Sequence, residues 1–202
     1  APNVDFTLTK ILDYRGHLSF SGGTIQIGDF EPMWVDMASD FELDGANARL
    51  SRIALETDGA STDLVGQVDL TNFPEMSYSL ESDIDFTRMR EIFFAADPFR
   101  ASGQGRFSGT FHKFTGGHDL RGVFSSAEAG INQFRFPEMA GHLRWQSDRF
   151  DVWDVVATPY GGQASVDFSM APLGAEDPGE AIFDVRYEGL RLAEIAPALE
   201  LR

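Results

Sequence analysis

The chain has 202 residues, of which 43% are hydrophobic and 24% charged, so it can bury a sizeable apolar core. Lys and Arg total 16 against 32 Asp and Glu, and the formal net charge of -16 argues against a nucleic-acid partner, whose phosphates need cations. Cysteine is absent, which excludes disulfides, thiolate metal sites and a cysteine nucleophile. No apolar run approaches the roughly 18 residues of a membrane-spanning helix, and we expect a soluble piece of a processed or longer protein.

The aromatic composition is dominated by phenylalanine, with 18 Phe against 4 Tyr and 3 Trp. Phenylalanine lacks the polar tip that Tyr and Trp offer to a wet binding site. Together with 20 Gly and 9 Pro, this composition predicts many strands that bury one purely apolar face.

In the first half of the chain, apolar residues alternate with mostly polar ones at the period of two that is typical of half-buried strands. The alternating residues are, in chain order, Val4, Phe6 and Leu8; Leu18 and Phe20; Ile25 and Ile27; Val68 and Leu70; and Tyr78, Leu80, Ser82, Ile84 and Phe86. Residues typical of turns separate these strands at 21–23, 44–45, 58–59 and 72–74.

The same alternation continues through the second half of the chain. Its members are Phe107 and Phe111; Phe134 and Phe136; Leu143 and Trp145; Val155 and Ala157; Val166 and Phe168; and Phe183, Val185 and Tyr187. Turn residues follow at 116–117, 159–162 and 174–179. The chain is therefore predicted to be all-β, a long antiparallel meander of about fourteen to eighteen strands at the usual five or six residues each.

Helical spacing of apolar residues occurs only in short pieces near 7–12, 87–95 and 190–199, each directly after a strand. In the second piece Met89, Ile92 and Phe93 lie at helical spacing, and Thr87 is a candidate cap. The strands that lead into the three pieces are also similar to one another, which indicates an internal repeat.

A second pair of segments supports the repeat, because residues 49–55 resemble residues 149–155. In both segments the apolar parity switches at the same place, which predicts a β-bulge or bend. We expect residues 1–202 to form one continuous segment of a longer repeat protein, with the end of one unit at 1–15, a second unit at 16–100 and a third at 101–202.

The sequence offers weak candidates for catalytic or metal sites. The four histidines lie in polar or glycine-rich stretches near strand ends and are expected at the exposed surface: His17, His112, His118 and His142. Neither a His-x-x-x-His pair nor an EF-hand loop occurs. The glycines of 103–109 have the wrong spacing for a dinucleotide loop and suit a bend in a sheet.

Two carboxylate pairs, Asp83 with Asp85 and Asp151 with Asp154, raise the alternative of a hydrolase that uses paired acids. Spacing by two places Asp83 and Asp85 on one strand face, where a solvated outer surface explains them better. We therefore expect no enzyme, no catalytic residue, no bound metal and no cofactor.

The stretches 155–168 and 183–197 carry a strand that ends in Tyr-Gly-Gly, a Val-Asp-Phe strand, a further strand and a Gly-Leu-x-Leu-x-x-Ile helix. This pattern resembles the AsmA and TamB superfamily of bacterial envelope proteins. The resemblance implies a repeating β-groove, or β-taco: a long sheet curled into an open trough with an apolar lining.

The same resemblance implies a location in the periplasm, as part of a larger protein anchored in the inner membrane that contacts an outer-membrane partner. The implied function is conduction of phospholipid, or another acyl-chain lipid, between the two membranes. An assembly factor for outer-membrane β-barrel proteins is an alternative within this resemblance. The alternatives outside it are a sugar-binding or adhesive β-module, which the excess of Phe disfavours, and a closed sandwich with the same residues as core.

On this interpretation, the alternating apolar residues line the trough and bind lipid, whereas Ser82 and Ser165 are expected on the opposite face. The expected lining residues are Phe6, Leu18, Phe20, Ile27, Leu55, Val68, Leu70, Leu80, Ile84, Phe86, Phe107, Phe111, Phe134, Phe136, Leu143, Trp145, Val155, Val166, Phe168, Phe183, Val185 and Tyr187.

Overall fold

The computed structural model describes residues 3–8, 13–26, 31–93, 95, 98–173 and 179–199, which form one antiparallel sheet of 12 strands and two short helices. The strands are β1 (Asn3–Leu8), β2 (Asp13–Ile25), β3 (Met33–Asp44), β4 (Asn47–Thr57), β5 (Ala60–Asp69), β6 (Met76–Asp85), β7 (Ala101–Phe114), β8 (Gly117–Ile131), β9 (Phe134–Gln146), β10 (Phe150–Ala157), β11 (Gln163–Ala171) and β12 (Glu180–Glu188). The helices are α1 (Phe86–Phe93) and α2 (Leu192–Ile195), with a single 3-10 turn at Pro159–Gly161.

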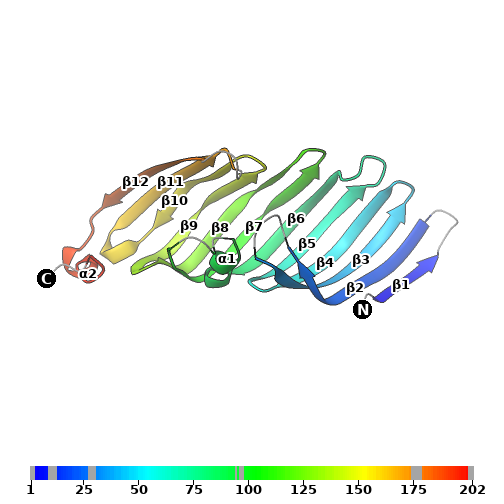
Figure 1. Cartoon of the computed structure of the whole chain (residues 1–202), viewed down its shortest axis with the longest axis horizontal. Coiled ribbons are helices and arrows are strands. Elements are labelled where there is room, and N and C mark those ends of the chain that lie inside the picture. The colour runs from blue at the N-terminus through cyan, green and yellow to red at the C-terminus, as the bar shows by residue number, and fades with distance from the viewer. Residues whose placement is uncertain are drawn as a thin grey trace.

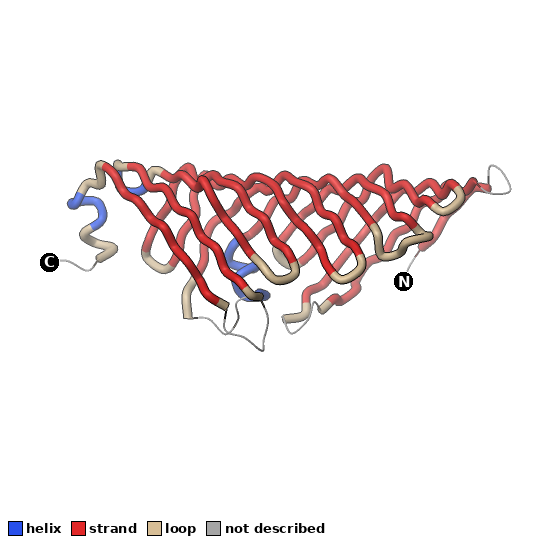
Figure 2. Tube along the Cα trace, turned by 90° about the horizontal axis from the view of Figure 1, so that it is seen from above, coloured by secondary structure: helices blue, strands red, loops and turns tan. Residues whose placement is uncertain are grey.

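Each strand pairs with the strands that precede and follow it in sequence, so β1 and β12 lie at opposite ends of an open sheet (Figure 1). Seen from above in Figure 2, the strands of the front and rear layers slope in opposite directions and meet along one long ridge, which gives an open trough. Extensive strand contacts in the described residues join only neighbours in sequence. The expected all-β meander with a few short helices is confirmed, and the sheet does not close into a sandwich.

Bulges bend the long strands across the trough. The switch of apolar parity predicted a bulge after Leu50, and the pairing of β4 with β5 shifts between Leu50 and Ile53. The matching shift in the third predicted unit falls between Val152 and Val155, where β10 pairs with β11. Asp154, with a φ of 52°, lies inside that second shift.

The sheet has fewer strands than predicted, 12 in place of about fourteen to eighteen, because its strands are longer than the usual five or six residues. The prediction of a turn at 21–23 is wrong: Leu18, Phe20 and Ile25 all belong to β2. The pairing of β2 with β3 shifts between Phe20 and Gly23, so this glycine segment is a bulge within one strand.

The second and third helical predictions are confirmed, although α2 has only 4 residues. Of the first predicted piece, Thr7 and Leu8 lie in β1 and residues 9–12 lie outside the described residues. The expected cap Thr87 is not the capping residue, since a carboxylate oxygen of Asp85 accepts a hydrogen bond from the Arg88 amide at 3.1 Å. Residues 16–100 contain most of β2, then β3 to β6 and α1, and residues 101–202 contain β7 to β12 and α2.

Helix α1 packs against the sheet and is well buried there. Ile92 of α1 is 1% exposed, and Met33 and Val35 of β3 are also buried. The carbonyl of Ile92 accepts a hydrogen bond from the amide of Glu31 at 3.2 Å, and the Arg88 guanidinium contacts Asp58 at 3.3 Å. Helix α1 therefore fastens the segment before β3 and the turn after β4 to the end of β6.

Candidate functional site

The register of the sheet assigns every paired residue to one of two faces, because residues directly opposite each other in an antiparallel pair project on the same side. Starting from Leu80, one unbroken row of partners crosses seven strands: Leu80, Gly109, Gly122, Leu143, Val152, Phe168 and Phe183. We call the face that carries this row the inner face and the opposite face the outer face.

The predicted lining residues gather on the inner face, as the alternation required. Those with a described side chain in a paired strand position are Leu18, Phe20, Leu55, Val68, Leu80, Ile84, Phe107, Phe111, Phe134, Phe136, Leu143, Trp145, Val155, Val166, Phe168, Phe183, Val185 and Tyr187. The buried side chains of the described strands, such as those of Val35, Phe107 and Val155, also belong to this face, which indicates that it is the concave one.

Four predicted lining residues are placed differently. Phe86 begins α1, and its ring lies directly over the backbone of Gly105, so it still covers the inner face. Leu70 lies beyond the end of β5 and is exposed, and its amide donates a hydrogen bond to the carbonyl of Ala46 at 2.7 Å. Ile27 and the side chain of Phe6 lie outside the described residues.

The expectation that Ser82 lies on the outer face is wrong. Ser82 is buried on the inner face, opposite Phe107, and its hydroxyl is 2.8 Å from that of Thr62. Two hydroxyls that bind each other can be buried among apolar side chains without an unpaired polar atom. Ser165, by contrast, is exposed on the outer face opposite Arg186, as expected.

Glycines bring aromatic rings down onto the backbone of the inner face. A Cβ atom at Gly109 would lie 2.8 Å, and one at Gly122 2.7 Å, from the tip of the Phe107 ring. Phe107 is only 5% exposed although no second sheet covers it, because its ring occupies the space that these two glycines leave free. Gly109, one of the glycines expected to bend the sheet, thus also forms part of the floor of the trough.

A row of rings follows the inner face near the margin where β7 turns into β8 and β9 into β10. Ring centroids are 6.5 Å apart for Tyr78 and Phe111, 6.2 Å for Phe111 and His118, and 5.2 Å for His118 and Trp145. Further along the sheet, Phe150 and Phe168 are 6.1 Å apart, and Phe168 and Phe183 are 4.6 Å apart. Sequence reasoning omitted His118 and Phe150 from the lining, although both continue the alternation of their strands.

His118 is therefore not the exposed histidine that was expected. Its Nε2 atom is buried and has no hydrogen-bond partner among the described residues, and its Nδ1 is 3.4 Å from the hydroxyl of Ser147. Burial lowers the pKa of the imidazole, and the nearby Lys113 ammonium lowers it further, against the opposite influence of Asp119. A neutral imidazole fits this apolar position.

The other candidate acids and bases have structural partners on the outer face or at strand ends. His17 lies 2.8 Å from Asp40, His112 lies 2.7 Å from Glu75, and the ring of His142 stacks on Trp153 at 5.4 Å. The two carboxylate pairs are similarly engaged.

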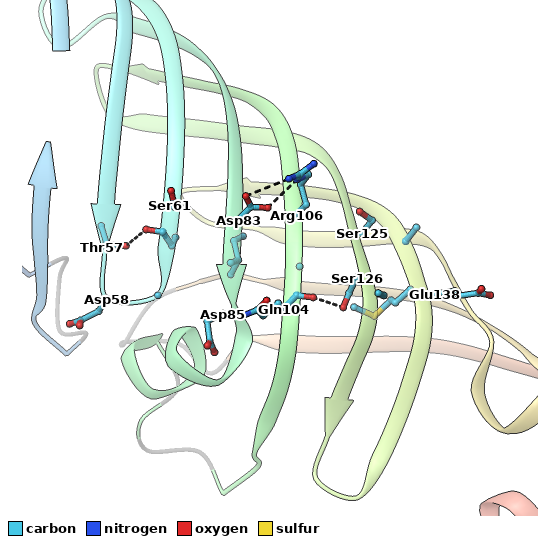
Figure 3. A pocket seen from close by; sticks show the side chains of 17 residues that line it. Thr57, Asp58, Ser61, Asp83, Asp85, Gln104, Arg106, Ser125, Ser126 and Glu138 are labelled. Atoms are coloured by element: carbon cyan, nitrogen blue, oxygen red, sulfur yellow. Dashed lines mark hydrogen bonds and ion pairs between the residues drawn. The ribbon is translucent and has the colours of Figure 1, made fainter. Parts of the chain in front are cut away.

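Asp83 forms an ion pair with Arg106 at 3.0 Å, Asp85 caps α1, and Asp151 contacts Arg149 at 2.7 Å. The Asp83–Arg106 pair crosses an open depression that Figure 3 shows between β4 and β9, where the Ser126 hydroxyl also donates to the carbonyl of Gln104 at 2.6 Å. Asp83 and Asp151 thus neutralise neighbouring guanidinium groups, and Asp85 caps a helix. Asp154 lies 3.8 Å from the ring of His142, and these carboxylates do not converge on an enclosed pocket.

The described residues contain no group of three or more His, Cys, Asp and Glu able to hold a metal ion. Neither described helix has the length and apolar character needed to cross a membrane. The inner face remains as the candidate functional site. In comparisons with known proteins, no family model, curated protein or solved structure matches this chain.

Proposed function

We propose that the inner face binds the acyl chains of phospholipids and conducts them along the trough. The observation that carries this proposal is an apolar concave face that continues across the strands of the sheet and that no second sheet covers in the described part of the chain. A monomeric soluble protein rarely leaves a continuous apolar surface of this extent without a ligand or partner.

The distribution of charge supports the same conclusion. Within the described strands, Lys113 is the one charged residue at an inner-face position, although the whole chain carries 16 basic and 32 acidic residues. Ion pairs such as Arg106 with Asp83 lie on the outer face. An acyl chain on the inner face therefore meets mainly hydrocarbon, with few polar groups such as the bonded hydroxyls of Thr62 and Ser82.

Conduction requires similar contacts at successive strands, with no position that holds the lipid much more tightly than the next. Each methylene that leaves water contributes about 0.8 kcal/mol wherever it is buried. Leu64 and Leu80 offer aliphatic surface on β5 and β6, and Leu143 and Val152 do so on β9 and β10. The Phe107 ring covers the two glycines between them, so apolar contact continues and the free energy of a sliding chain stays nearly level. At about 4.8 Å between strands, the 12 strands provide a path of roughly 53 Å.

The resemblance to AsmA and TamB proteins supports the biological setting of this proposal. In that setting the chain acts in the periplasm as part of a larger protein anchored in the inner membrane. It passes phospholipid towards an outer-membrane partner and needs neither catalysis nor a cofactor. The closing test is native mass spectrometry of the purified chain before and after organic extraction. We expect the chain to carry phospholipid that organic extraction removes. A chain that is purified from a lysate containing membranes and carries no lipid would contradict the proposal.

Two adjacent residues of β5 provide a matched test of the face. Leu64 points to the inner face and Val65, which is exposed, to the outer face. Leu64→Asp should reduce the amount of bound phospholipid several-fold, because a carboxylate among apolar side chains disrupts acyl-chain contact. Val65→Asp should leave binding near the wild-type amount.

Photo-crosslinkers at positions 168 and 165 of β11 extend this comparison to the other end of the sheet. Position 168 lies on the inner face and should label phospholipid, and position 165 on the outer face should not. Equal labelling from both positions, or equal binding by the two Asp variants when both are folded by circular dichroism, would argue against a lipid path on the inner face.

A further inference from the structure

Side chains with an apolar body and a polar tip gather at one margin of the inner face. The turns that follow β3, β5, β7 and β9 form this margin, which we call the β7–β8 margin. The inner-face residues of this kind near it, each within three residues of a strand end, are Tyr14, Tyr78, Lys113, His118 and Trp145. In the described strands Tyr187 alone lies near the opposite margin, where Phe86 and Phe134 lie instead.

Such side chains suit the boundary between hydrocarbon and water. In bilayers Tyr and Trp concentrate at the level of the headgroups, and a Lys side chain packs its stem along apolar surface while its ammonium reaches water. The β7–β8 margin therefore has the composition of a headgroup region, and the inner face beyond it has that of a hydrocarbon region. A phospholipid fits this arrangement in one orientation.

Lys113 is the charged residue of the inner face in the described strands. It lies opposite Met76 of β6 and His118 of β8, and none of the ion pairs among the described residues includes it. Burial lowers the pKa of His118 and so favours its neutral form, which leaves the ammonium as the positive group at this margin. In a chain with a net charge of -16, such an ammonium on an apolar face indicates an anionic ligand there.

We propose that the β7–β8 margin holds the headgroup of the bound lipid, that the Lys113 ammonium pairs with its phosphate, and that the chain prefers phospholipids whose headgroup has a net negative charge. This inference rests on the proposed function and adds an orientation and a headgroup preference to it. The acyl chains then run from the margin across the inner face.

The length of an acyl chain agrees with this orientation. The hydrocarbon core of a bilayer is about 30 Å thick, so the chains of one leaflet reach about 15 Å. At about 3.4 Å per residue, this reach leads along β6 from Met76, opposite Lys113, to Leu80, opposite Gly109. The end of the acyl chain thus meets the floor of the trough, where the Phe107 ring lies over Gly109.

The charge of the headgroup decides how much the ammonium contributes. The phosphate of phosphatidylglycerol carries an unbalanced negative charge, whereas the phosphate of phosphatidylcholine is balanced by the choline ammonium of the same headgroup. One Lys beside an anionic headgroup strengthens binding by about fivefold. An exposed ion pair of this strength selects among lipids without stopping their movement along the trough.

Loading from mixed vesicles tests the headgroup preference. The purified chain is incubated with vesicles of equal amounts of phosphatidylglycerol and phosphatidylcholine and separated from them, and its bound lipids are counted by mass spectrometry. Both lipids come from the same surface, so repulsion between the acidic chain and the vesicle affects them alike. Lys113→Gln should lower the ratio of bound phosphatidylglycerol to phosphatidylcholine about fivefold relative to the wild type, with about the same total amount of lipid.

Two further variants serve as matched controls. Lys113→Arg keeps the positive charge and should keep the wild-type ratio. Arg121→Gln removes one positive charge from the exposed outer face of β8 and should also keep that ratio. A ratio that is the same in Lys113→Gln as in the wild type, or that falls as far in either control variant, would overturn the headgroup contact.

Photo-crosslinkers at positions 76 and 80 of β6 test the orientation. Fragmentation of the crosslinked lipid identifies which of its carbons has reacted. Position 76, opposite Lys113, should react near the glycerol, and position 80 should react near the methyl ends of the acyl chains. The reverse order, or the same carbons at both positions, would overturn the orientation.

These outcomes differ from a failure of the proposed function. A chain that takes up neither lipid contradicts lipid binding and this inference together, whereas a chain that takes up both lipids regardless of Lys113 contradicts the inference alone. Glycerol phosphate offers the phosphate without acyl chains and should give no measurable binding in isothermal titration calorimetry. Binding of glycerol phosphate that Lys113→Gln abolishes would assign the margin to a soluble phosphate ligand and overturn the proposal.

Discussion

The two described helices each come after a strand of the sheet, yet they differ in how well they are packed. Helix α1 follows β6 and buries Ile92 to 1% exposure, whereas α2 follows β12, buries no residue and leaves Leu192 68% exposed. The inner faces of the preceding strands differ in the same way: Ser82 of β6 is buried, whereas Phe183 of β12 is 67% exposed.

The cause of the difference is the strand that comes next. Strand β7 pairs with β6 and passes beneath α1, where Gly105 leaves space for the ring of Phe86. No described strand lies beyond β12. Helix α1 thus lies over two adjacent strands, β6 and β7, whereas the main described contacts of α2 are with the 3-10 turn at Pro159–Gly161.

The prediction with the largest expected effect compares the loss of a buried phenylalanine, Phe107, with the loss of an exposed one, Phe183 of β12. Phe107→Ala removes a buried ring from the floor formed by Gly109 and Gly122, and should lower the free energy of unfolding by about 3–5 kcal/mol. Phe183→Ala, at an exposed position of β12, should lower it by less than about 1 kcal/mol. Urea denaturation at concentrations where the chain is monomeric measures both values, and equal losses would contradict the proposed role of the neighbouring strand.

The next comparison addresses the helices themselves. Ile92→Ala should destabilise the chain by about 2–4 kcal/mol, because the cavity lies between α1 and the sheet and the removed methylenes lose their contacts. Leu192→Ala should change the free energy of unfolding by no more than about 0.5 kcal/mol. Similar urea midpoints for these two variants would mean that α1 contributes no more to stability than α2.

Sequence reasoning identified the faces of this sheet better than its strands. Alternation placed Phe168 and Val185 on one face because a period of two survives regardless of which strands become neighbours. The bulge after Leu50 was also predictable, since a bulge leaves its mark as a switch of parity within one strand. A similar switch of parity between Phe20 and Ile25 led to the wrong prediction of a turn, because one strand with a bulge has the same pattern as two short strands.

Burial was harder to predict than direction. The burial of Phe107 depends on Gly122, a residue of the following strand that only the register brings beneath the ring. Ser82 is buried because the register places the hydroxyl of Thr62 beside it, and a polar residue type alone suggested the opposite face. The contrast between α1 and α2 likewise depends on a neighbouring strand that neither helical sequence specifies.

The smallest expected effect concerns pH and sharpens the contrast between covered and open positions. The imidazole of His118 lies among Phe111 and Trp145 on the inner face, and burial followed by the Lys113 charge lowers its pKa. Because the unfolded chain has the ordinary, higher histidine pKa, it binds more protons than the folded chain once the pH falls below about 6.5. The contribution of His118 to stability is therefore present at neutral pH and is lost as the pH falls through the pKa of the unfolded state towards the pKa of the folded state.

His118→Phe keeps a ring of similar size and removes this titration, so its urea midpoint should decline less than that of the wild type between about pH 7 and about pH 5.5. His142→Gln, on the outer face, should leave the His118 contribution in place, and an identical decline for wild type and His118→Phe would show that the inner face does not favour the neutral imidazole.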